Sequence, residues 1–193
     1  MGRKKISRGN EINLLMSILL KNIVRFFLFI FIQVFVLNKI PPIHQFVVPY
    51  IYFLFILWLP FSVGRFYLML IAFVYGFSLD LLVGTPGIHA APCVLIAFIR
   101  PFLLSLLLPQ ETTELSYLEP GIKSMGWAPY AVYILLLTFF HHTYLVLIEW
   151  IDFGDFMFFF GKVTATTAIS LLLIFLIELF FYRKGKFRTN KAY

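Results

Sequence analysis

Residues 72–91 read Ala72-Phe73-Val74-Tyr75-Gly76-Phe77-Ser78-Leu79-Asp80-Leu81-Leu82-Val83-Gly84-Thr85-Pro86-Gly87-Ile88-His89-Ala90-Ala91. The segment joins two long apolar runs through a short turn that begins at Gly84 and ends at Gly87. Glycine permits backbone angles that other residues resist, and Pro86 pre-sets a turn. We therefore expect a tight hairpin between two antiparallel membrane-spanning helices.

The rest of the chain has the composition of a membrane protein. Of its 193 residues, 61% are hydrophobic, 20% are aromatic and 13% are charged. Soluble domains are about 45–50% apolar and about 25% charged, and a water-soluble core could not hide this much apolar surface. The composition therefore excludes the water-soluble classes, and the single cysteine, Cys93, excludes an internal disulfide.

Six apolar segments are long enough to cross a membrane, which takes roughly 17–25 residues for about 30 Å of hydrocarbon. They cover about 22–38, 43–59, 66–83, 88–108, 127–150 and 159–182. The second is the shortest, with Pro49 inside it and Pro60 at its end. The predicted fold class is therefore all-α: a polytopic integral membrane protein with six transmembrane helices in residues 22–182. Basic cytoplasmic tails at 1–21 and 183–193 flank this domain.

Basic residues predict the orientation of the chain. With six spans, twelve of the 16 Lys and Arg residues fall on the side of the two tails, and only Lys39 and Lys162 fall on the other side. Cytoplasmic segments carry such an excess, so both termini should be cytoplasmic, in a bacterial inner membrane. If segment 43–59 were re-entrant, five spans would remain and the tails would oppose each other, so we favour six. Basic tails of this kind indicate contacts with membrane lipids rather than with nucleic acid.

Asp80 carries the clearest functional signal. A carboxylate inside a span is costly and normally faces protein or water. Gly76 lies four residues earlier on the same helix face, and a small residue there lets a neighbouring helix approach closely. One interpretation is a site for a solute or coupling ion. The other, which we favour, is a structural role as a hydrogen-bonding partner or as a cap for the turn at Gly84. A structural role predicts that Asp80→Asn is tolerated while Asp80→Ala is not.

Other polar residues give weaker signals. His141 and His142 lie near the middle of the fifth span, and adjacent residues do not face the same site on a helix. A buried, hydrogen-bonded histidine is favoured over a proton relay. Arg100 lies within the fourth span, where a long side chain can snorkel towards an interface. The sequence contains no Walker A loop, dinucleotide fingerprint, G-x-S-x-G elbow, H-E-x-x-H or Cys/His cluster, so no catalytic residue, metal or cofactor is predicted.

Residues 72–91 resemble one family, the rod shape-determining protein MreD. In that family a glycine and an aspartate four apart end one span, and a small-residue turn with a Pro-Gly element opens the next. Here these positions are Gly76, Asp80, and Pro86 with Gly87, and the Thr-Pro-Gly-x-His-Ala-Ala pattern resembles the Bacteroidetes form. The resemblance covers about 66–103 at the level of motif and the whole membrane domain at the level of topology.

The resemblance implies a non-enzymatic role in the cell-elongation machinery, which supports lateral peptidoglycan synthesis and regulates cell shape. The implied partners are an MreC-like single-span protein, the MreB cytoskeleton, and the elongation glycosyltransferase and transpeptidase, in direct or indirect contact. The implied fold is similar to the six-helix substrate-binding subunits of energy-coupling-factor transporters. The alternative function is therefore a small-molecule-binding subunit of a transporter. The binding or packing candidates are Gly76, Asp80, Gly84, Pro86, Gly87, His89 and His141.

Overall fold

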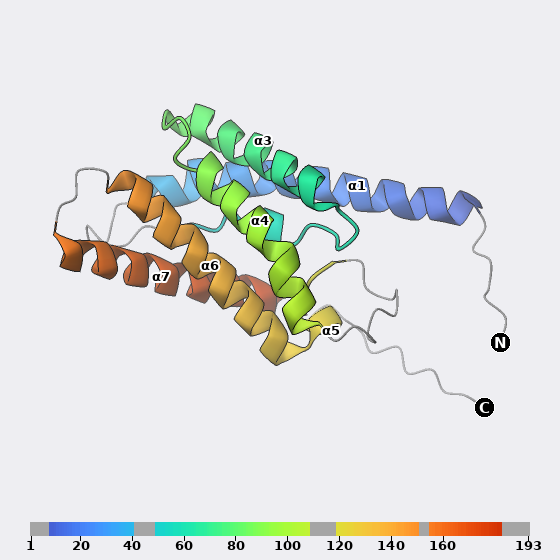
Figure 1. Cartoon of the computed structure of the whole chain (residues 1–193). Coiled ribbons are helices and arrows are strands. Elements are labelled where there is room, and N and C mark those ends of the chain that lie inside the picture. Colours follow the sequence, from blue (N-terminus) through green and yellow to red (C-terminus); the bar gives the residue numbers. More distant parts are fainter. Residues whose placement is uncertain (1–7, 41–48, 109–118, 151–154, 183–193) are drawn as a thin grey trace.

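The computed structural model describes residues 8–40, 49–108, 119–150 and 155–182, which are mostly helical (Figure 1). The described elements are α1 Arg8–Phe31, the π-helical η1 Ile32–Val36, the 3₁₀-helical η2 Leu37–Lys39, α2 Leu54–Leu57, α3 Arg65–Val83, α4 Ala90–Leu107, α5 Ile122–Met125, α6 Trp127–Glu149 and α7 Phe156–Tyr182. Five helices are long and apolar enough to cross a membrane: Met16–Lys39, α3, α4, α6 and the part of α7 up to Phe180. The described part of the chain is therefore an all-α, multi-pass membrane fold.

The segment expected as the second span is not among these five helices. Its described part, from Pro49 onward, contains one helical turn, α2, between non-helical residues; residues 41–48 lie outside the described residues. Residues 50–59 are all buried, and within 52–57 no residue exposes more than 3% of its surface. A count of six membrane-spanning helices is therefore not confirmed. This run is apolar because it forms the core of the bundle.

The buried segment passes through much of the height of the bundle. At its start, the Tyr50 ring lies beside His142 in the C-terminal half of α6, with centroids 5.9 Å apart. At its end, Trp58 Nε1 donates to the Tyr130 hydroxyl, near the start of α6, at 2.9 Å. These two positions on α6 are separated by about 18 Å along the helix axis. The chain therefore runs from one end of the bundle towards the other through its core.

The N-terminal part of α1 and the C-terminal end of α7 lie at the same end of the bundle (Figure 1). Lys21 of α1 forms a 2.7 Å ion pair with Glu119, just before α5. A single residue, Gly126, separates α5 from α6. Trp127, at the start of α6, stacks on Phe175 of α7 with centroids 6.0 Å apart. These contacts connect α1, α5, α6 and α7 at one end.

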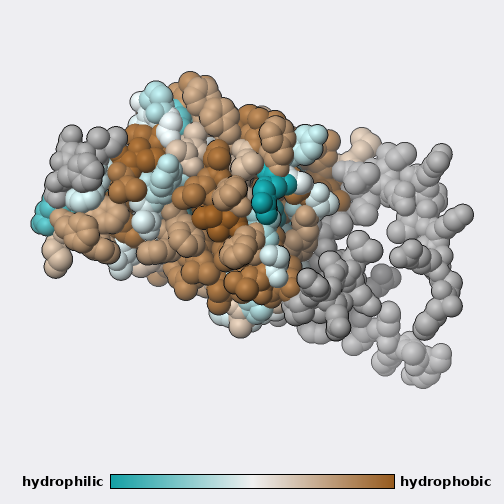
Figure 2. All heavy atoms as spheres, in the orientation of Figure 1, coloured by the Kyte–Doolittle hydropathy of each residue, from teal (hydrophilic) through white to brown (hydrophobic). Residues whose placement is uncertain are grey.

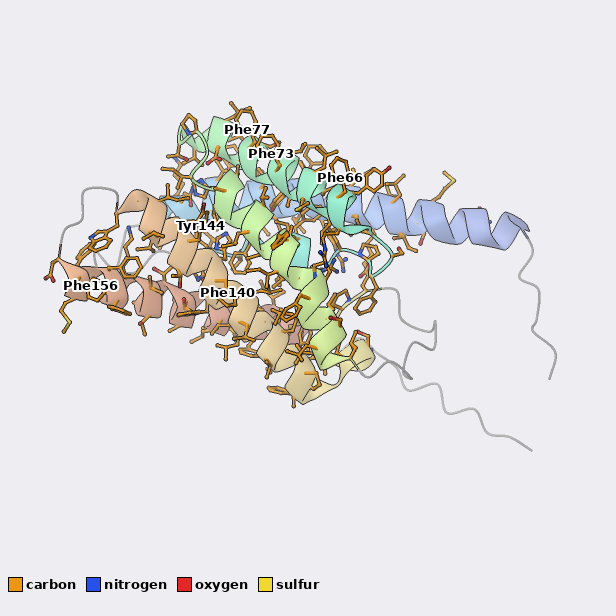
Figure 3. The ribbon with its side chains drawn as sticks, in the orientation of Figure 1. Phe66, Phe73, Phe77, Phe140, Tyr144 and Phe156 are labelled. Carbon is orange, nitrogen blue, oxygen red and sulfur yellow. The ribbon has the colours of Figure 1, made fainter. Side chains whose placement is uncertain are left out.

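Apolar side chains cover the outside of the bundle as well as its core (Figure 2). Phe66, Phe73 and Phe77 project from α3, Phe140 from α6 and Phe156 from α7 (Figure 3), and Phe66 is 69% exposed. An apolar exterior of this extent is unfavourable in water. It suits contact with lipid chains.

Candidate functional site

The segment that resembles MreD forms the predicted tight hairpin between α3 and α4. Gly84 caps the C-terminus of α3 with a left-handed φ of 78°, and its N–H donates to the Asp80 carbonyl at 2.8 Å. Gly87 also has a positive φ, of 89°. A Cβ is strained in this backbone region, which explains why glycine stands at both positions. Pro86 lies between them, and α4 begins at Ala90.

Asp80 closes the hairpin through its buried carboxylate. Its Oδ2 accepts the backbone N–H groups of Gly87 and Ala90 at 3.0 and 2.9 Å. Its Oδ1 accepts the His89 N–H at 2.9 Å, and lies 2.8 Å from His89 Nδ1 and 3.3 Å from the Thr85 hydroxyl. The first N–H groups of a helix have no partner within that helix, and a negative charge there is favourable. Asp80 is therefore an anionic cap that holds the start of α4 on the end of α3.

Gly76 brings the two helices into direct backbone contact. A Cβ at this position would lie 2.6 Å from Ala90 Cα and 2.9 Å from the His89 carbonyl oxygen. Any side chain would therefore overlap the backbone of α4. The close approach predicted for the face that carries Gly76 is confirmed.

Two histidines lie beside Tyr52 of the buried segment, and a third, His142, contacts its neighbours Tyr50 and Phe53. The Tyr52 hydroxyl lies 2.9 Å from His141 Nε2, and the Tyr52 ring centroid lies 5.5 Å from that of His89. His142 Nδ1 lies 3.3 Å from the Thr167 hydroxyl of α7. His141 and His142 are fully buried, so both are buried, hydrogen-bonded histidines of the kind that the sequence favours. The cluster connects α6 to the hairpin through the buried segment.

Side chains of the surrounding helices pair with the backbone of the buried segment. They are Gln33 of η1, Tyr75 of α3, Arg100 of α4, Tyr133 of α6 and Ser170 of α7. The Gln33 amide, for example, accepts the Ile51 N–H at 3.1 Å and donates to the Pro49 carbonyl at 3.2 Å. Non-helical backbone at membrane depth is tolerated only where protein or water satisfies its polar groups. These contacts therefore explain how the segment can lie unwound inside the bundle.

The sequence suggests that Arg100 snorkels towards an interface, but in the structure the residue is buried in the bundle. Only 1% of the Arg100 surface is exposed. Its Nε donates to the Tyr133 hydroxyl at 2.9 Å, and its Nη2 donates to the Leu59 carbonyl. A guanidinium offers five donors in a fixed fork, which suits it to a segment with free carbonyls. Arg100 and Asp80 therefore bind different parts of the chain.

The structure brings the sequence-predicted candidates together. The hairpin contains Gly76, Asp80, Gly84, Pro86, Gly87 and His89, and Tyr52 connects it to His141. Sequence reasoning missed Gln33, Tyr75, Tyr133 and Ser170, although a glutamine inside a predicted span is a signal in its own right. Within the described ranges, no group of three or more His, Cys, Asp or Glu residues is placed to hold a metal ion.

The fold and the site define an all-α multi-pass membrane protein, built around a buried non-helical segment and a carboxylate-capped helical hairpin. Comparison of the chain with protein-family models, curated proteins and solved structures finds no match. What the chain does is therefore inferred from its own residues.

Proposed function

We propose that the chain is a non-enzymatic membrane component of the cell-elongation machinery, as its resemblance to the MreD family at residues 72–91 implies. In this role it supports lateral peptidoglycan synthesis and cell shape through a complex with an MreC-like single-span protein. Contacts with the MreB cytoskeleton and with the elongation glycosyltransferase and transpeptidase are direct or indirect.

One observation favours this proposal over a solute-binding role: the Asp80 carboxylate is already occupied by hydrogen bonds from its own chain. It accepts three backbone N–H groups, which a solute or coupling ion would have to displace. Gly76 leaves no space between α3 and α4 at this level. A described pocket lies elsewhere, between α1 and α7, and its walls are mainly apolar. In the described part of the chain, the hairpin is therefore suited to packing, which favours a scaffold over a transport subunit.

Loss of the chain should convert elongated host cells into rounder ones, because a scaffold of the elongation machinery directs where lateral wall is made. The affinity-tagged chain should also retain the MreC-like protein through purification in detergent. Light microscopy and quantitative co-purification measure the two effects, with an unrelated multi-pass protein carrying the same tag as the control. Normal cell shape combined with lost uptake of a vitamin-like solute would support the transport subunit instead.

We also propose an inner-membrane location with six crossings, of which five are long helices and one is the buried segment. The charge bias and the shared end of α1 and α7 support this topology. Reporter fusions at residues 1 and 193 should both report a cytoplasmic location, and an insertion near Asp155 should report a periplasmic one. Termini on opposite sides of the membrane would contradict the six-crossing topology.

A further inference from the structure

A groove lies between α1 and α7. In Figure 1, α1 passes behind α4, and α7 passes behind α6. The volume of the groove is about 860 Å³, and Ile51 and Trp58 of the buried segment lie in its lining. The wall formed by α1 and η1 extends from Ser17 to Ile32 and is apolar beyond Arg25, with Ile177 on the α7 side. From Arg25 to Ile32 the groove therefore offers an apolar wall about 10 Å long.

Charged side chains precede the apolar wall of the groove. Lys21 and Arg25 of α1 line this part together with Glu178 of α7. Lys21 Nζ and Arg25 Nη1 both bind the same oxygen, Glu119 Oε2, at 2.7 and 2.9 Å. The Arg25 guanidinium also lies 5.1 Å from the centroid of the Trp58 ring, a cation–π contact that holds it at the groove. Two cations are thus already positioned around one anionic oxygen.

The shape and charge of the groove match a phospholipid. Its apolar wall is about 10 Å long, which lies within the roughly 15 Å depth of one leaflet of the hydrocarbon. Its volume lies within the roughly 300–1,000 Å³ of typical ligand pockets, whereas a partner helix is about 10–12 Å wide and must span the whole bilayer. A phosphate oxygen has the same charge-assisted hydrogen-bonding chemistry as the Glu119 carboxylate. Lipid chains therefore suit the apolar wall, and a phosphate that takes the place of the Glu119 carboxylate suits Lys21 and Arg25.

We propose that this groove binds one phospholipid, with its acyl chains along α1 and α7 and its phosphate between Lys21 and Arg25. Glu119 competes with the phosphate for the same two cations. The site does not depend on the role in cell elongation, because it rests only on the groove and on the ion pairs at its end.

Native mass spectrometry of the purified full-length chain, titrated with phosphatidylglycerol, tests the site. Arg25→Gln should weaken phosphatidylglycerol binding about tenfold, since it removes a charge-assisted contact. Glu119→Gln should strengthen it about threefold, because it removes the carboxylate that competes for both cations. Leu28→Trp should weaken it by filling the groove. Arg65→Gln is the matched control, because Arg65 lies over the Phe98 ring at 5.9 Å and outside the groove.

Diacylglycerol with the same acyl chains serves as the phosphate-free probe and should bind at least tenfold more weakly than phosphatidylglycerol. Equal affinities for the two lipids would overturn the phosphate site. Equal effects of Arg25→Gln and Arg65→Gln would do the same, and unchanged binding by Leu28→Trp would overturn the groove as the site of the acyl chains. A general loss of folding would weaken lipid binding, so it cannot explain the stronger binding expected for Glu119→Gln.

Discussion

Replacing Asp80 with Asn is expected to lower the free energy of unfolding by about 3 kcal/mol, a large effect for a nearly isosteric change. Oδ1 accepts the His89 N–H, and Oδ2 accepts those of Gly87 and Ala90. An Asn amide has only one oxygen, so its NH₂ group faces at least one of these donors in either orientation. A buried donor without a partner costs about 1–3 kcal/mol, and the remaining bonds lose the strength that the charge confers.

Thermal unfolding of the purified protein in detergent measures this effect. For a chain of this size, about 3 kcal/mol corresponds to a fall of about 6–12 °C in Tm. Asp155→Asn is the matched control, because the exposed Asp155 carboxylate accepts a single N–H among the described residues, that of Met157, at 2.9 Å. Asn and Asp are equally good at such a helix N-terminus, so this variant should unfold close to the wild-type temperature. An unchanged Tm for Asp80→Asn would show that Asp80 is not the cap. A folded, partner-bound Asp80→Asn variant without function would instead indicate a ligand site.

The sequence alone predicts the opposite result for Asp80→Asn, because Asn keeps the side-chain shape and one oxygen. That prediction treats Asp80 as the partner of a single donor. The structure shows three backbone donors, supplied by residues seven, nine and ten positions later in the chain. Their convergence depends on the backbone path of the turn at Gly84 and Gly87, which composition and spacing do not specify.

The two helices that flank the turn, and α6, are largely predictable. The expected spans 66–83, 88–108 and 127–150 correspond to Arg65–Val83, Ala90–Leu107 and Trp127–Glu149. Their boundaries are accurate because each apolar run stops at a residue with a physical reason to stop it, such as a left-handed glycine or an interfacial tryptophan. The N-terminal boundary is less so, since α1 already begins at Arg8, inside the stretch expected as a tail.

The buried segment is the feature that hydropathy does not reveal. Residues exposed to lipid and residues buried in a core have the same apolar composition, so a window average cannot separate them. The uninterrupted apolar run here is only 50–59, and a run of about 10–14 residues is typical of a buried or re-entrant segment rather than a span. The expected span 43–59 reaches the length of a membrane-crossing helix only because it contains the polar residues His44 and Gln45.

Contacts within the hairpin are partly predictable, because Asp80 and its donors lie within one helix–turn unit. Contacts around Tyr52 are not, since 89 residues separate it from His141 and 76 separate Leu57 from Tyr133. No local pattern encodes such a pair. Each depends on the arrangement of α3, α4, α6 and the buried segment in three dimensions.

Replacing Gly76 with Ala is expected to destabilise the protein by about 3 kcal/mol, at the upper end of the range for overpacked sites. The added methyl carbon would lie 2.6 Å from Ala90 Cα and 3.0 Å from Ala90 N. Both of these atoms belong to the backbone of α4, so no side-chain rotation can relieve the overlap. The helices must separate, and the bonds from the start of α4 to Asp80 must lengthen with them.

Gly64→Ala is the matched control for this substitution, because the same added methyl meets only Tyr67 Cδ2, at 3.8 Å. Its cost should stay within the roughly 1 kcal/mol that a helix N-cap change involves. The Tm and the amount of co-purified MreC-like protein should both fall for Gly76→Ala and fall further for Gly76→Leu. Gly64→Ala should leave both close to wild type. If Gly76→Leu unfolds at the wild-type temperature, the backbone contact between α3 and α4 does not hold the hairpin together. If Gly76→Leu unfolds at a lower temperature than the wild type yet still binds the MreC-like protein, the hairpin stabilises the fold without forming the partner surface.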